Sequence, residues 1–245
     1  MGLFRYFSKE AKDERKRASA QKRLSNMYYQ SVERMGAAQE MAELAQQNDV
    51  QALQILLQRF EHMNPSATID RDEKDYVVEL LAGIGSFAID GTRDYVRKTA
   101  EAIYWPMRFL QKVLDEAEFT AFLAEVLAET SEDYTRDPKK KLGLVQLAGE
   151  HHNDDVKKEI LRFVNDYDEA VRFHAIDVAL RLEIEGAREV LLEHWVSPQE
   201  ESGRIWNQLA DAFISRGWSV GDKAAAVKER LPLGATVNAK GIVER

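Results

Sequence analysis

DEAVRFHAIDVALRL, residues 168–182, is the stretch that best indicates the fold of this chain. Asp168 stands where an N-cap residue accepts the first free backbone N–H groups of a helix. Arg172 follows one turn later, within reach of Asp168 or of a carboxylate on a neighbouring element. A thin face on this helix is formed by Ala175, Ala179 and Leu180. Because such a face lets helices approach closely, we expect it to pack against neighbouring helices. A second helix is predicted in GAREVLLEHW (186–195).

This pair of helices recurs with a period of 32 residues. One cationic and three apolar positions are kept at that spacing: Lys140, Arg172 and Arg204; Ala148, Leu180 and Ala212; Ile160, Leu192 and Ala224; Phe163, Trp195 and Val227. The repeat is degenerate, since Asp177 aligns with Leu209. A period of about 20 to 50 residues with two helices in each unit is typical of a helical solenoid.

The spacing D-x-x-V-R-x-x-A-x-x-x-A-L in residues 168–180 resembles the HEAT repeat, in the short form known from phycobilisome-lyase-type proteins. The resemblance covers about residues 138–230, and DYVRKTAEAI (94–103) echoes it. It implies an all-α fold: a right-handed α-solenoid of degenerate HEAT-like hairpins with a long N-terminal helical extension. HEAT-type proteins are mostly scaffolds and adaptors that hold partners on a concave face, although a minority are enzymes.

The rest of the chain agrees with an all-α fold, because good helix formers dominate and no sustained period-2 alternation occurs. The predicted segments are a basic N-terminal arm (1–23), an amphipathic helix (24–47), divergent HEAT-like helices (48–130), HEAT-like repeats (131–230) and a C-terminal tail or cap (231–245). Local patterns predict either one long helix from Ser8 to about Gln47 or two helices with a break near Gly36. They also predict an N-cap at Asn48-Asp49, a loop over 64–72, close packing at Gly83 and Gly85, and a helix beginning at Asp94. The acidic loop 129–141 is interpreted as a solvated insertion, with a docking loop as the alternative.

Charge separates the first 23 residues from the remainder. Residues 1–23 carry a net charge of +5 and the whole chain carries −8, so the other residues carry −13. An acidic body should repel nucleic acid and anionic lipid. The residues of the arm that we single out are Leu3, Phe4, Phe7, Arg15, Lys16, Arg17, Lys22 and Arg23. We interpret the arm as a solvated, partly frayed helix start, and the alternative is a weak contact with an anionic membrane or another polyanion.

Composition excludes several classes of protein. The chain has no cysteine, so disulfides and thiolate metal sites are impossible. No apolar run reaches the roughly 18 residues of a membrane span. Residues 3–7 are too short for a secretory signal, and Arg5 interrupts them. We expect a cytoplasmic protein, with a peripheral membrane location as the alternative.

The sequence predicts no catalytic residue, cofactor or metal. The HEAT-like enzyme deoxyhypusine hydroxylase binds a di-iron centre through His-Glu pairs, but the pairs here have the reverse order: Glu61-His62, Glu150-His151 and Glu193-His194. Their separations are not multiples of the 32-residue period, so they would not line one solenoid face. EHHNDD (150–155) is interpreted as a helix boundary, where Asn153 or Asp154 caps the next helix.

A resemblance in length and architecture to HEAT-like alkylpurine DNA glycosylases supplies the main enzymatic alternative. Such a protein uses Trp and Asp at the lesion, and here Trp206 and Asp211 share one predicted helix. The acidic solenoid has the wrong sign of charge for gripping DNA. We therefore expect a non-catalytic scaffold or adaptor for a protein partner. Its candidate contact residues are Arg97, Arg172 and Arg204, which alternatively brace the stack.

Overall fold

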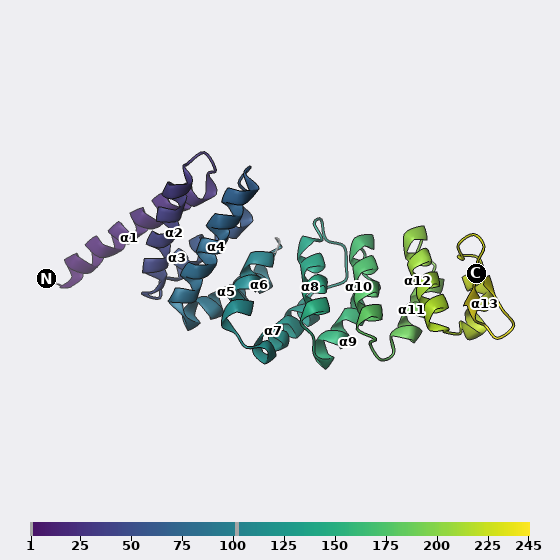
Figure 1. Ribbon diagram of the computed structural model, residues 1–245. Helices are drawn as coiled ribbons and strands as arrows, with labels where there is room; N and C mark the ends of the chain where they lie inside the picture. The colour runs from purple at the N-terminus through teal and green to yellow at the C-terminus, as the bar shows by residue number, and fades with distance from the viewer. Residues whose placement is uncertain (1, 101–102) are drawn as a thin grey trace. The chain divides into compact units, whose positions relative to one another are not determined.

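The fold is all-α, with helices over 71% of the chain and two short strands near its end (Figure 1). The computed structural model describes residues 2–100 and 103–245, and side chains from Lys9 onward. The side chains of Leu3, Phe4 and Phe7 therefore lie outside the described part. The chain forms two compact units, Met1–Phe122 and Leu123–Arg245. Each is described by itself below.

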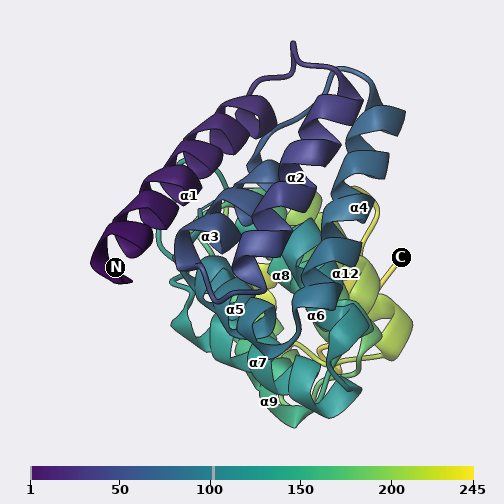
Figure 2. The ribbon, with the colours of Figure 1, turned by 90° about the vertical axis from the view of Figure 1, so that its left-hand side faces the viewer.

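Unit 1 is built from two layers of helices with one further helix across them. Its elements are α1 (Gly2–Ser25), α2 (Ser31–Ala45), α3 (Val50–Gln58), η1 (Arg59–Glu61), α4 (Ala67–Ile84), α5 (Ser86–Lys98) and α6 (Tyr104–Val113). In the first layer α2 packs on α4 and α4 on α6, while α3 packs on α5 in the second. α1 packs on both α2 and α3 (Figure 2). The boundary between the units falls inside α7 (Glu116–Glu129).

The N-terminal helices break at a different place from the one predicted. α1 ends at Ser25 and α2 begins at Ser31, whereas Gly36 lies inside α2. The break has a local cause. The Asn26 side chain accepts a hydrogen bond from the Tyr28 backbone N–H at 2.9 Å, and Gln30 with Glu33 forms a capping box that starts α2. The predicted cap of the next helix is confirmed, because Asp49 accepts from the Ala52 N–H at 3.0 Å.

Two further predictions of helix bounds in unit 1 are wrong. Residues 64–72 are not all loop, since α4 begins at Ala67 behind the cap Ser66. Asp94 lies within α5, which ends at Lys98, so DYVRK closes a helix instead of opening one.

Gly83 and Gly85 do not mark close helix packing. A Cβ added at either would meet nothing within 4 Å, and Gly85 serves as the turn between α4 and α5 with a φ of +85°. The close approach is at Gly91, where a Cβ would come within 2.4 Å of Leu53 Cδ2. α3 and α5 therefore meet at a glycine that the sequence pattern did not single out.

Unit 2 carries two rows of helices. Its elements are α8 (Lys139–Glu150), α9 (Asp154–Phe163), α10 (Glu169–Arg181), α11 (Ala187–Val196), α12 (Gly203–Arg216), η2 (Gly221–Lys223) and α13 (Ala224–Lys228). Figure 1 shows α8, α10 and α12 in one row, with α9 and α11 in the other. Asp168 caps α10 as predicted, accepting from Ala170 N at 3.0 Å and Val171 N at 3.2 Å. Ala175 and Ala179 are fully buried, which confirms the predicted packing face.

The last residues of unit 2 form a small hairpin. β1 (Thr236–Val237) pairs antiparallel with β2 (Val243–Glu244). The Val220 N–H donates to the Gly241 carbonyl at 2.8 Å, and Val243 is buried against the end of the helical rows. The hairpin therefore covers apolar surface beside α12 and α13.

Candidate functional site

From Arg17 to Leu24, α1 is bound to unit 1 by its inner face. Arg17 pairs with Asp49 at 2.5 Å, and Arg23 pairs with Glu40 of α2 at 2.7 Å. Leu24 on the same face is buried. Because Asp49 also caps α3, the Arg17 pair joins α1 to the start of that helix. Part of the positive charge of the predicted arm is therefore used inside the unit.

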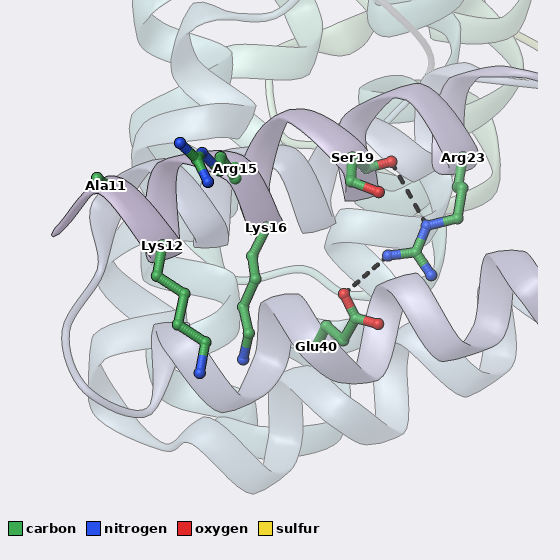
Figure 3. A pocket seen from close by; sticks show the side chains of 7 residues that line it. All are labelled: Ala11, Lys12, Arg15, Lys16, Ser19, Arg23 and Glu40. Atoms are coloured by element: carbon green, nitrogen blue, oxygen red, sulfur yellow. Dashed lines mark hydrogen bonds and ion pairs between the residues drawn. The ribbon is translucent and has the colours of Figure 1, made fainter. Parts of the chain in front are cut away.

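One flank of α1 forms a basic hollow against α2, which we call the α1 hollow. Its volume is about 940 Å³, and its lining is Ala11, Lys12, Arg15, Lys16, Ser19, Arg23 and Glu40 (Figure 3). Arg23 donates to Glu40 and to the Ser19 carbonyl. Within the described part of the chain, Lys12, Arg15 and Lys16 have no ion-pair partner.

The electrostatics of the α1 hollow favour anions. Lys12 and Lys16, which have no ion-pair partner among the described residues, extend toward α2, where Arg23 already neutralises Glu40 (Figure 3). The remainder of the chain beyond residue 23 carries −13, so this flank has the opposite sign to the body. Clustered cations of this kind attract phosphate and carboxylate groups, and the attraction weakens with salt. The arrangement can bind an anionic surface.

Glu73 of α4 is the centre of a buried ion cluster in unit 1. It accepts from Arg34 of α2 at 2.6 Å and from Arg59 of η1 at 2.9 Å, and Arg59 also reaches Asp70. Burial alone would raise the pKa of Glu73, but hydrogen bonds from Arg34, Ser31 and Arg59 lower it below its ordinary value. The cluster ties three elements together. The sequence pattern gave no sign of it, because its members are scattered along the chain.

Arg172, a predicted contact residue, braces unit 2 from within. It pairs with Glu200 at 2.7 Å and donates to the carbonyls of Asp166 and Tyr167, both at 3.0 Å. Glu200 also accepts from the Ser202 N–H, and its Oε2 lies 2.8 Å from His194 Nε2. Burial would raise the pKa of Glu200, but hydrogen bonds from His194, Arg172 and the Ser202 backbone lower it to about 2.

The same arrangement occurs one repeat earlier. Asp166 stands two residues before the cap of α10, as Glu200 stands two residues before the cap of α12. Asp166 accepts from the Asp168 N–H at 2.8 Å and from Lys141 Nζ at 2.7 Å. Lys141 thus takes the role of Arg172, although the 32-residue alignment selects its neighbour Lys140. Loop 130–138 is tied down as well, because Lys141 donates to the Asp133 carbonyl at 2.6 Å.

Arg97 and Arg204 have different surroundings from Arg172. Arg97 belongs to unit 1, where its guanidinium lies 5.1 Å from the centre of the Phe122 ring. Arg204 is exposed and lies over the Phe173 ring at 3.5 Å. Of the three predicted contact residues, Arg204 is therefore the one that presents its charge on a described outer surface.

Four other arginines, the arginine ties, join helices across unit 2. Each donates to a carbonyl at or just beyond the end of the helix two places earlier: Arg162 to Ala128 and Thr130, Arg181 to Gly149, Arg216 to Leu180, and Arg230 to Trp195 and Ser197. The ties from Arg216 to Leu180 and from Arg230 to Ser197 both measure 2.8 Å. Helix-end carbonyls lack intrahelical partners, and a cation there opposes the negative end of the helix dipole. The residue separations run from 32 to 36.

The residues with candidate chemistry, Asn153, Asp211 and Trp206, have contacts within unit 2. Asn153 caps α9 by accepting from the Val156 N–H at 2.9 Å, as predicted. Asp211 pairs with Arg245 at 2.5 Å, and Trp206 lies 5.3 Å from the guanidinium of Arg230. Among the described residues, no group of three or more His, Asp or Glu side chains could hold a metal ion.

Comparison with protein-family models, curated proteins and solved structures finds no match. None of the described helices is both long and apolar enough to cross a bilayer.

Proposed function

We propose that this chain is a non-catalytic adaptor, a right-handed HEAT-like α-solenoid that binds a protein partner on its helical-repeat surface. The observation that carries the proposal is the set of arginine ties in unit 2. Each joins a helix to the one two places earlier at a nearly constant separation. A recurring tie of this kind fits a stack in which each repeat contacts only its neighbours, and stacks of this kind offer extended binding surfaces.

The partner surface that we propose lies on α10 and α12. Arg204 is exposed above the half-buried Phe173, and Gln208 of α12 donates to the Phe173 carbonyl at 3.1 Å. Asn207 is exposed on the same helix as Arg204. Arginine over an aromatic ring is a common anchor at protein interfaces, because it combines a planar cation with apolar area. Arg172 is not part of the surface that we propose, since it donates its hydrogen bonds within unit 2.

Photo-crosslinking tests this proposal. A photoreactive residue is placed at Asn207 in one variant and at the exposed Lys158 of α9 in another. We expect Asn207 to give one discrete protein adduct in a native extract, which the substitution Arg204→Glu removes without changing thermal stability. Equal adducts from both positions, or substrate turnover by the purified chain with no adduct, would contradict an adaptor with this surface.

A further inference from the structure

The outer face of α1 differs from its inner face in what covers it. The inner face is used by the buried Ala20 and Leu24 and by the ion pairs of Arg17 and Arg23. On the outer face, the exposed residues are Ala11, Arg15, Ala18 and Lys22. Ala11 and Arg15 also border the α1 hollow, and Ala18 and Lys22 border a second hollow shared with Ile55, Gln58, Glu61 and His62.

Helical spacing continues the positions of that stripe toward the start of α1. α1 is continuous from Gly2, and positions 4, 7, 11, 15, 18 and 22 follow one another at steps of three or four residues. Residues three or four apart share one face of a helix. The sequence has Phe at positions 4 and 7. By sequence position, the stripe therefore aligns two phenylalanines and two alanines with Arg15 and Lys22, beside the α1 hollow with Lys12 and Lys16.

We propose that α1 is an interfacial helix that binds the surface of an anionic bilayer, with its inner face remaining packed on α2 and α3. Lys12, Arg15 and Lys16 contact lipid phosphates, while the aromatic start of the stripe enters the boundary between headgroups and acyl chains. A lipid surface can contact both the cations and the aromatic residues, because it offers negative charge and apolar volume side by side. An acidic protein segment would use the cations alone. This inference does not depend on the adaptor function.

The distribution of charge along the chain determines which part of the protein faces the membrane. The residues beyond the arm carry −13 and are repelled by an anionic membrane, whereas the arm carries +5. Only an orientation with α1 toward the lipid brings opposite charges together. The interaction is therefore sensitive to salt, since these cations are exposed or half-buried at the surface.

Vesicle flotation of the full chain tests the proposal. We expect the chain to float with vesicles of phosphatidylcholine and phosphatidylglycerol and to stay behind with phosphatidylcholine alone. The triple substitution Lys12→Glu, Arg15→Glu, Lys16→Glu should lower the bound fraction about tenfold or more, because each cation near an anionic surface contributes separately. The double substitution Phe4→Glu, Phe7→Glu should remove binding while leaving the cations in place.

A control variant changes charge equally elsewhere. Lys158→Glu, Lys228→Glu, Lys240→Glu alters three exposed lysines of unit 2 and should float like the unmodified chain. Circular dichroism of each variant checks that its helices form. Three results overturn the proposal: no flotation of the full chain, equal loss in the control variant, or a triple variant that loses binding to polyglutamate and keeps binding to vesicles.

Discussion

Unit 1 and unit 2 both stack short helices in two rows, but they hold the rows together differently. Unit 2 repeats one device, an arginine that donates to the end of the helix two places earlier. Unit 1 concentrates its polar contacts in one cluster, where Glu73 serves both Arg34 and Arg59. Neither device follows the 32-residue period of the sequence, because the tie arginines at 162, 181, 216 and 230 are unevenly spaced and the cluster occurs once.

Breaking the single cluster should have the largest effect on stability. Glu73→Gln leaves the buried Arg34 and Arg59 without this carboxylate, and loss of one partner of a buried pair typically costs about 3–5 kcal/mol. Glu79→Gln on the same helix removes only an exposed pair with Lys112, so it should cost at most about 1 kcal/mol. Urea unfolding of both variants measures the contrast. Equal losses would show that the cluster does not hold unit 1 together.

Acid should weaken unit 2 through Glu200. Its folded pKa of about 2 lies below its ordinary value of 4.5. The stabilisation is therefore complete above pH 4.5 and is lost as pH falls from 4.5 toward 2, by about 3 kcal/mol in total. Glu200→Gln should remove this part of the acid dependence, whereas Glu201→Gln at the exposed neighbour should not. Urea unfolding midpoints measured between pH 6 and pH 2.5 report this loss of stability. Identical pH dependence in the unmodified chain and both variants would contradict a role for Glu200.

The attachment of α1 should give the smallest effect. Arg17→Gln removes a partly buried pair with Asp49 and should cost about 0.5–1 kcal/mol. Arg15→Gln on the outer face should stay within about 0.5 kcal/mol. Thermal unfolding compares the two variants. If Arg15→Gln cost as much as Arg17→Gln, the helix would not be docked by the face described above.

The sequence predicted best what depends on neighbouring residues. The caps Asp49, Asn153 and Asp168 each bond a backbone group two or three residues away, so a short window of sequence contains the whole interaction. The fully buried Ala175 and Ala179 were also predictable, because small residues at helical spacing favour close packing. Local chemistry of this kind needs no knowledge of the fold.

Interactions across the fold escaped prediction for physical reasons. The arginine ties join residues 32 to 36 apart, and a long flexible side chain hides which carbonyl it will reach. Lys141 replaces the expected Lys140, since one residue turns a helix by about 100° and so changes its partner. The docking of α1 was missed because charged residues such as Arg17 can cover apolar surface with their stems while their heads pair elsewhere.

Hydrogen exchange on Arg216→Gln tests most directly the central claim that unit 2 is a stack tied from neighbour to neighbour. Arg216 donates to the Leu180 carbonyl at the end of α10. We predict that amides in the last turns of α10 and α12 exchange about fivefold faster, as expected for a lost contact of about 1 kcal/mol, while α8 keeps its protection. The same acceleration in α8 as in α10, or none in either helix, would contradict it.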